Sequence, residues 1–253
     1  MIIDYLHRKI VNYHYINALN VAASICNHDT FLELKNCNYG KNVALCGAGP
    51  SLEKYEPIDN CIHIALNRAL LNPRIKFDYF FADDWTGIHF FQNELKSYDC
   101  KKYFGHAIGN DDCQIPESFR IECNAKRYYT DLYRVANGFE SRFVCDVDKM
   151  AIGNMANIAL SIMQVVLFTN PRIIYLVGCD ASAGHFIQPD NLKTEEIKRQ
   201  EEDLKIAVSS NRTIQSWVDL KKFAEVFYPD TKIVSINPVG LKGIFVDEYQ
   251  SNK

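Results

Sequence analysis

Short, almost wholly apolar runs, separated by stretches of helical periodicity, constrain the fold of this chain more than any other feature. The runs are NVALCGAG (42–49), CIHIALN (61–67), FDYFFADD (77–84), PRIIYLVGCD (171–180) and TKIVSINP (231–238). The helical stretches are NMANIALSIMQVVLFT (154–169), the charged TEEIKRQEEDLKIAV (194–208) and TIQSWVDLKKFAEVFY (213–228). Strands without a polar face are typical of a parallel sheet that helices cover on both sides.

We therefore predict an α/β protein: a Rossmann-like, mostly parallel sheet with helices on both faces, preceded by N-terminal helices. Apolar residues at helical spacing, such as Ile10, Tyr13 and Ile16, predict one or two helices within a lead-in of residues 1–40. Residues 41–253 are long enough for a single nucleotide-binding transferase domain. Between 95 and 145 only short apolar pieces are visible, including KKYFGHAI (101–108) and RFVCDV (142–147).

Composition excludes several classes of protein. A formal net charge of −3 gives no basic excess, so we expect no binding to nucleic acid. The nine cysteines include no C-x-x-C pair, which favours reduced thiols over disulfides or a zinc site. We expect a cytoplasmic protein, because the sequence has no signal peptide and no apolar run of the roughly 18 residues that a membrane span needs. The oligomeric state is not predicted.

Polar groups follow each of the predicted strands. They are Gly47, Gly49 and Ser51 after the first, Asn67 and Arg68 after the second, Asp83 and Asp84 after the third, Gly178, Asp180 and His185 after the fourth, and Asn237 after the fifth; Gly153 and Asn154 lie at the head of the buried helix. In an open parallel sheet, ligands bind outside the carboxyl ends of the strands. The sequence therefore predicts a ligand site built from these residues.

The first of these loops, Gly47 to Ser51, fits neither common phosphate-binding pattern. Leu52 stands where the dinucleotide fingerprint has its third glycine, and the spacing before Lys54 is not that of a P-loop. We expect the loop N–H groups and the Ser51 hydroxyl to point at an anion near a helix N-terminus. The alternative is a glycine turn that only reverses the chain.

The acids and the histidine suggest two kinds of chemistry. Asp83 and Asp84 are candidate ligands of a Mg²⁺ ion that bridges a diphosphate, with a capping role in a turn as the alternative. Asp180 and His185 are candidate bases for deprotonating an incoming hydroxyl.

The polar groups outside the glycine loop are candidate contacts of a nucleotide. The Asn67 amide is suited to a base or a hydroxyl, and Arg68 to a phosphate. Gly153 and Asn154 are suited to an anion or a ribose, unless Asn154 is only the cap of the helix.

Three blocks of the sequence resemble the MptE-like domain family. They are NVALCGAGPSL, IHIALNRALLNPRIKFDYFFADD and GNMANIALSIMQVVLFTNPRIIYLVGCDAS, with a weaker similarity at VSINPVGLKGIF. That family is named for archaeal 6-hydroxymethyl-7,8-dihydropterin diphosphokinases. It is related in pattern to bacterial sialyltransferases and to flagellin-glycosylation accessory proteins, which share G-x-G-P-S-L. The resemblance covers about residues 41–185.

The resemblance implies different chemistry for each branch. In the diphosphokinases, ATP gives a diphosphate to a pterin alcohol with Mg²⁺, and the acids near Asp83 would hold the metal. In the sialyltransferases, the positions matched by Gly47, Gly49, Ser51, Asn67 and Gly178 receive the cytidine nucleotide of an activated sugar.

Two departures from the sialyltransferase pattern are visible. Ala48 stands where many of these enzymes have asparagine, and SSNRTIQSW (209–217) has no histidine where they have their base.

From these patterns we expect a glycosyltransferase with a CMP-type sugar donor and a small-molecule or glycan acceptor, acting in surface polysaccharide or glycoconjugate assembly. The first alternative is a Mg²⁺-dependent diphosphokinase that uses ATP on a pterin-like alcohol. The second is a catalytically silent nucleotide-binding partner in a glycosylation complex.

Overall fold

A nine-stranded sheet forms the centre of the protein in the computed structural model, which describes residues 2–108, 114–131, 143–155, 157–181 and 212–250. The strands are β1 (Asn42–Cys46), β2 (Cys61–Leu66), β3 (Tyr79–Ala82), β4 (Lys101–Ile108), β5 (Lys126–Asp131), β6 (Ile152–Gly153), β7 (Ile173–Val177), β8 (Lys232–Ile236) and β9 (Val246–Glu248). Their order is β6-β5-β4-β3-β2-β1-β7-β8-β9, and every neighbouring pair is parallel. The predicted α/β class with a parallel sheet is confirmed.

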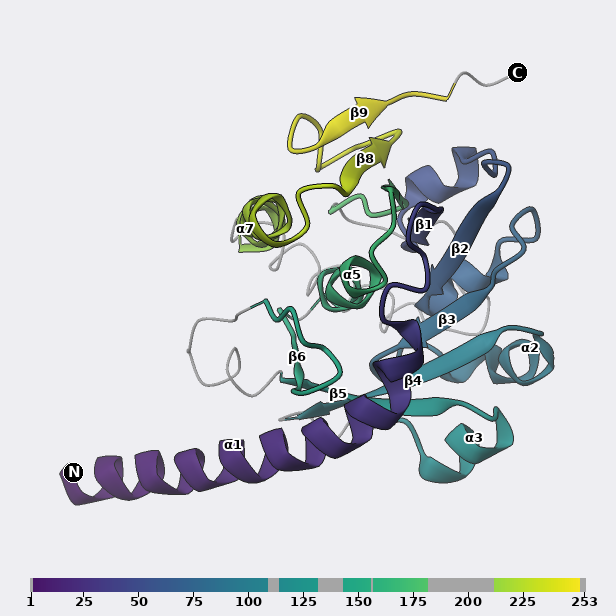
Figure 1. Ribbon diagram of the computed structural model, residues 1–253. Coiled ribbons are helices and arrows are strands. Elements are labelled where there is room, and N and C mark those ends of the chain that lie inside the picture. Colours follow the sequence, from purple (N-terminus) through teal and green to yellow (C-terminus); the bar gives the residue numbers. More distant parts are fainter. Residues whose placement is uncertain (1, 109–113, 132–142, 156, 182–211, 251–253) are drawn as a thin grey trace, which may run out of the picture.

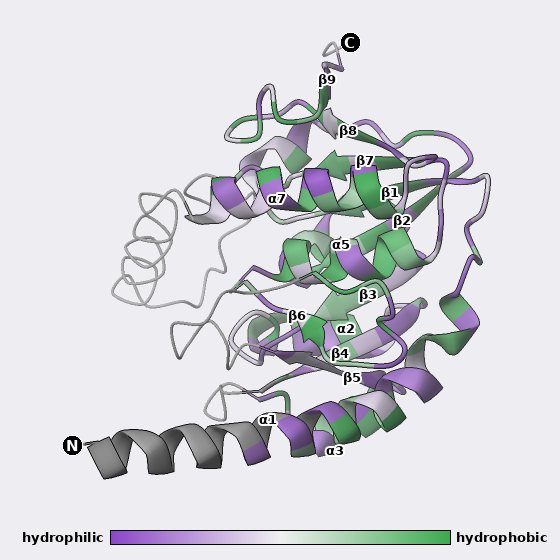
Figure 2. Ribbon diagram, turned by 60° about the vertical axis from the view of Figure 1, so that its left-hand side comes forward, coloured by the Kyte–Doolittle hydropathy of each residue, from purple (hydrophilic) through white to green (hydrophobic). Residues whose placement is uncertain are grey.

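Two hydrophobic layers cover the sheet, one on each face. The first contains α5 (Ile158–Phe168), α7 (Arg212–Phe227), the end of α1 (Ile2–Phe31) and the short helix η1 (Leu32–Leu34). The second contains α2 (Gln92–Ser97), α3 (Glu117–Glu122) and the 3₁₀ helices η2 (Pro50–Lys54), η3 (Asn67–Leu71) and η4 (His89–Phe91). In Figure 2, α5 is mostly green and lies alongside α7 on the same side of the sheet, as expected of a buried helix.

The N-terminal lead-in forms one long helix. Only the C-terminal part of α1 lies against the sheet, and the rest extends past the β5–β6 edge (Figure 1). Asn27 fixes this contact, because its side-chain amide exchanges hydrogen bonds with the backbone of Tyr129 and also donates to the Met150 carbonyl at 2.8 Å. The helix therefore joins β5 to the segment before β6.

The structure confirms the five predicted strands and adds four. KKYFGHAI is strand β4, while β5, β6 and β9 had no assignment. The buried helix begins at Ile158, four residues later than predicted, because Asn157 is its N-cap and accepts the Ala159 N–H at 3.0 Å. The predicted charged helix over 194–208 lies outside the described residues.

The order of the strands determines where a ligand site can lie. From β1 the chain adds β2 to β6 in one direction, and α5 then returns it across the sheet to β7, on the other side of β1. The direction of winding therefore reverses between β1 and β7. In open α/β sheets, ligands bind at this reversal, outside the carboxyl ends of the strands.

Within the described residues, no helix combines the length and apolar character that crossing a membrane requires.

Candidate functional site

The loops that follow β1 and β7 are bonded directly to one another. The N–H groups of Gly47 and Gly49 donate to the carbonyls of Val177 and Gly178, both at 2.8 Å. Ser51 donates its N–H to Oδ2 of Asp180 at 2.8 Å and its hydroxyl to Oδ1 of the same carboxylate. These donors, which we expected to face an anion, are therefore engaged within the protein.

The glycines of both loops are needed because the two backbones approach so closely. A Cβ at Gly47 would come 2.6 Å from the Gly178 carbonyl oxygen, and one at Gly49 would lie 2.7 Å from the same oxygen. Gly178 has a φ of +61°, in the left-handed region that favours glycine. The G-x-G pattern thus brings β1 against β7, and Asp180, only 4% exposed, fastens the contact.

Gly240, after β8, supports the same loop pair from the other side. Its N–H donates to the Asp180 carbonyl at 2.8 Å, and a Cβ there would lie 2.6 Å from that oxygen. The loops after β1, β7 and β8 are thus in contact at the carboxyl edge of the sheet.

Asn67 and Arg68 follow β2, the next strand on the other side of β1. Asn67 has a φ of +48°, and its Oδ1 is buried without a hydrogen-bond partner among the described residues. Arg68 is 4% exposed, and its guanidinium lies over the Phe90 ring, 4.9 Å from the centroid. Burial lowers the pKa of Arg68 to about 10, although the nearby Asp84 carboxylate opposes this shift. At neutral pH the guanidinium therefore remains a cation beside Asn67.

Asp83 and Asp84 have different surroundings although they are adjacent. Oδ1 of Asp83 accepts the Tyr128 hydroxyl at 2.5 Å, whereas Oδ1 of Asp84 accepts the Thr86 hydroxyl at 2.5 Å and the Gly87 N–H at 2.7 Å. Asp84 thus has the contacts of a turn cap, which was the alternative to a role as a Mg²⁺ ligand. No group of three or more His, Cys, Asp or Glu side chains suited to a metal ion occurs in the described part of the chain.

The environment of Asp83 favours its protonated form. The side chain is 7% exposed, and burial raises its pKa from 3.8 to about 7; the Tyr128 hydrogen bond opposes the shift and the Asp84 charge adds to it. Gly105 of β4 leaves the space for the carboxylate, since a Cβ there would overlap Oδ1 of Asp83. This acid is therefore poised to exchange a proton near neutral pH.

Gly153 ends β6 and Asn154 follows it, and both precede α5 rather than start the helix. The Gly153 N–H donates to Oε1 of Gln164 at 3.2 Å, and the Asn154 amide donates to the Thr130 hydroxyl at 2.9 Å. The alternative in which Asn154 caps the helix is wrong, because Asn157 has that position. The N-terminus of α5 lies at the carboxyl edge of the sheet, since the helix runs back from there to the start of β7.

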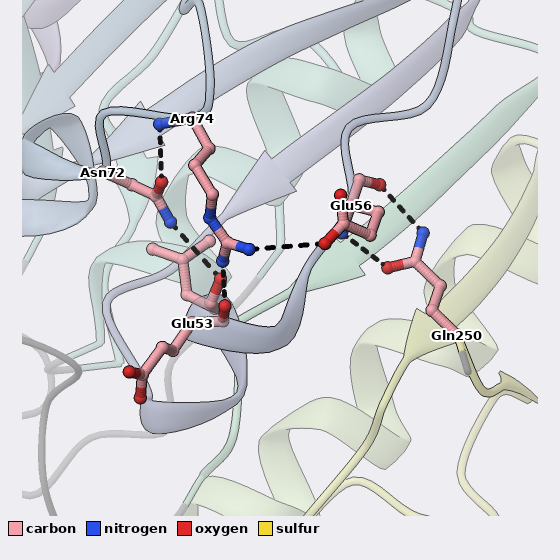
Figure 3. Close-up of polar contacts among 6 residues, drawn as sticks. Glu53, Glu56, Asn72, Arg74 and Gln250 are labelled. Carbon is pink, nitrogen blue, oxygen red and sulfur yellow. Dashed lines mark hydrogen bonds and ion pairs between the residues drawn. The ribbon is translucent and has the colours of Figure 1, made fainter. Parts of the chain in front are cut away.

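A polar network holds the outer side of the β1 loop (Figure 3). The Gln250 side chain accepts the Glu56 N–H at 2.8 Å and donates to the Glu56 carbonyl at 2.9 Å. Arg74 binds the Glu53 carbonyl and lies 3.4 Å from the Glu56 carboxylate, while Asn72 donates to the Leu52 carbonyl at 3.3 Å. Segments after β1, β2 and β9 are thus held together.

The predicted site residues that the structure describes form four groups. Gly47, Gly49, Ser51, Gly178 and Asp180 are in contact; Arg68, next to Asn67, lies near Asp84; Asp83 is bonded to Tyr128; Gly153 and Asn154 are bonded to Gln164 and Thr130. His185 lies outside the described residues.

Four residues near these groups were not predicted from the sequence: Tyr128, Gly105, Asn157 and Gly240. Of these, only Asn157 had a visible signal, an asparagine directly before an apolar helical run.

No family model and no curated protein matches this chain. Among solved structures, it is similar to the Campylobacter jejuni sialyltransferase CstII in complex with CMP-3FNeuAc, with 14% identity, a TM-score of 0.48, and 82% of this chain and 85% of that chain covered. CstII in complex with a trisaccharide acceptor and CMP gives 14% identity, a TM-score of 0.46, and coverage of 77% and 80%. The monofunctional α-2,3-sialyltransferase Cst-I from C. jejuni gives 13% identity and a TM-score of 0.44. The match covers 78% of this chain and 75% of that chain. Such distant likeness carries no substrate or residue role over to this chain.

Proposed function

We propose that this protein is a glycosyltransferase whose donor is a CMP-type nucleotide-activated sugar and whose acceptor is a small molecule or glycan, in surface polysaccharide or glycoconjugate assembly. The observation that carries this proposal is the buried Oδ1 of Asn67, which has no hydrogen-bond partner among the residues that the structure describes, at the carboxyl end of β2 next to the β1–β7 reversal. An amide oxygen in this state calls for a ligand donor, such as the amino group of cytosine or a ribose hydroxyl.

Two further features suit the phosphate of such a donor. The N-terminus of α5 lies at this edge, and the amides of a helix start attract anions. Arg68 supplies a buried positive charge beside Asn67, although its pKa is lowered to about 10. The loops after β1 and β7 act by holding this edge rigid, since their own donors are engaged.

The test is a thermal-shift series of the full chain with CMP, CDP, UDP, GDP and ATP, each with and without Mg²⁺. We expect CMP to raise the melting temperature without metal, because a ligand at 100 times its Kd adds about 2.7 kcal/mol of stability. Asn67→Ala should abolish this shift. Asn36→Ala is a matched control, because Asn36 also has positive φ, 56°, but lies between η1 and β1, far from the edge.

Each other outcome points to a different class of protein. A shift with ATP that requires Mg²⁺ and is lost in Asp83→Ala would indicate the diphosphokinase. A CMP shift without release of CMP from CMP-N-acetylneuraminic acid or other CMP-sugars would indicate the silent nucleotide-binding partner. No shift with any nucleotide would overturn the proposal.

A further inference from the structure

The proposed transfer requires a general base, and the contacts of the described residues argue against two candidates, Asp180 and His63. Both oxygens of Asp180 accept hydrogen bonds from Ser51, so protonating this carboxylate would break the contact between the β1 and β7 loops. His63 is buried inside β2 and paired with the Tyr55 hydroxyl at 3.0 Å, and burial lowers its pKa. Neither group is placed to take a proton from a substrate.

Asp83 differs from both of these groups. Its Oδ1 is occupied by Tyr128, but Oδ2 has no hydrogen-bond partner within the described residues. The carboxyl group follows β3, so it lies at the same edge of the sheet as Asn67, one strand farther from β1.

The spacing of the strands fits a bound sugar. Two strand intervals separate β3 from β1, which places Asp83 about 10 Å from the end of β1. A donor whose phosphate binds near β1 and Asn67 therefore has room for its sugar ring between that phosphate and Asp83. In Figure 1, β1, β2 and β3 lie side by side in this order.

We propose that Asp83 is the catalytic base of the transfer and that Tyr128 is the residue that positions it. The assignment deepens the proposed function and rests on it. The acceptor oxygen forms a bond to the anomeric carbon of the donor while the acceptor proton passes to Oδ2 of Asp83. The bond from that carbon to the phosphate oxygen breaks, and its electron pair leaves with CMP.

The charges around Asp83 suit this role. Tyr128 from β5 donates to Oδ1, Asp84 adds a neighbouring negative charge, and Gly105 of β4 presents no side chain. With a pKa of about 7, the carboxyl group releases its proton near neutral pH and accepts one again during the reaction. A carboxylate with an ordinary pKa would be a weaker base at this pH.

The test compares Asp83→Asn, Tyr128→Phe and Tyr55→Phe in the release of CMP from CMP-N-acetylneuraminic acid, with lactose or water as acceptor, from pH 5 to 9. Asp83→Asn should lower kcat by about 100- to 10,000-fold, as loss of a general base does, and keep the thermal shift with CMP. Tyr128→Phe removes a hydrogen bond that lowers the pKa of Asp83, so the acidic limb of the kcat/KM profile should move to higher pH. Tyr55→Phe, which removes another buried and paired hydroxyl, should leave that limb unchanged.

The outcomes separate this assignment from the proposed function. If wild-type protein gives no shift with CMP, the proposed function fails. If CMP binds and is released from the donor, but Asp83→Asn keeps wild-type kcat, the assignment of Asp83 alone is overturned. The ¹³C resonance of the Asp83 carboxyl group measures the pKa of this group without turnover. Titration near pH 7 supports the assignment, and titration below pH 5 overturns it.

Discussion

Two buried aspartates at one edge of the sheet show how the same side chain serves two purposes. Asp180, after β7, accepts the N–H and the hydroxyl of Ser51 and so joins loops that are far apart in the sequence. Asp83, after β3, accepts one hydroxyl, and burial raises its pKa to about 7. Asp180 accepts two hydrogen bonds and Asp83 accepts one, and each hydrogen bond to a carboxylate offsets part of the cost of removing it from water. Asp180 therefore stabilises the fold, whereas Asp83 remains available for chemistry.

The largest expected effect is in the pH dependence of stability that Asp83 causes. Its folded-state pKa of about 7 lies above the ordinary 3.8, so the unfolded chain ionises first as pH rises. The stabilisation is fully present below about pH 4 and is lost as pH rises through 7; the shift corresponds to roughly 4 kcal/mol at most. Asp83→Asn should lack this fall. Urea unfolding at pH 4.5, 6 and 8 measures it.

Asp84→Asn is the matched control for this experiment, because Asp84 is adjacent but caps an exposed turn. It should retain most of the fall in stability of the wild type, because the Asp84 charge is the smallest of the three contributions to the pKa of Asp83. An equal fall in Asp83→Asn would mean that another group causes it, and the contrast between the two buried aspartates would be lost.

The second effect concerns the close approach of the loops that Asp180 fastens. In Gly178→Ala, the Cβ would lie 2.9 Å from the Leu52 Cβ and overlap the Gly47 carbonyl, at a φ of +61°. Overpacking and the left-handed backbone together should cost about 3 kcal/mol of unfolding free energy.

Gly40→Ala measures the loss of unfolding free energy that the left-handed backbone causes alone, without overpacking. Gly40 has a φ of +74°, and no atom of the described residues lies within 4 Å of a Cβ placed there. It should cost about 1 kcal/mol. Equal losses of stability in the two variants, measured by chemical denaturation, would show that the approach of the two loops is not tight.

The third effect is the loss of the Asp180 acceptor. In Asp180→Asn, one Ser51 donor would face an amide NH₂ group in a buried position, which should cost about 2 kcal/mol. Asp247→Asn is the control, because Asp247 accepts the Gly243 N–H near the surface, at 3.0 Å, and should lose about 0.5 kcal/mol or less. An Asp180→Asn variant with wild-type stability and no turnover would instead make Asp180 the base.

The sequence was most informative about the centre of the sheet. The runs that became β1, β2, β3, β7 and β8 are apolar because both of their faces are covered. Strands β5 and β6 lie at one end of the sheet and have no long apolar run. The β5 sequence, KRYYTD, is half polar, and β6 has only two residues. Lys102 in β4 also interrupts the apolar pattern of its strand. The structure accommodates this lysine because its amine donates to the Tyr98 carbonyl at 2.6 Å.

The location of the candidate site was predictable, but its internal contacts were not. Parallel topology alone places Gly47, Asn67, Asp83 and Gly178 at one edge. The bond between Ser51 and Asp180 joins positions 129 residues apart, and the bond between Asp83 and Tyr128 joins positions 45 residues apart. No local pattern encodes such pairs, and they decide which acid joins two loops and which acid has a raised pKa.

The position of β1 between β2 and β7 also sets an order for folding during synthesis. As the chain leaves the ribosome, β1 can pair with β2 early, but its other side has no partner until β7, whose Val177 pairs with Cys46, has been made. For that interval the most apolar part of the sheet is an open edge, to which a neighbouring nascent chain can add. We expect that nascent chains released before β7 aggregate and that chains extending past it do so far less.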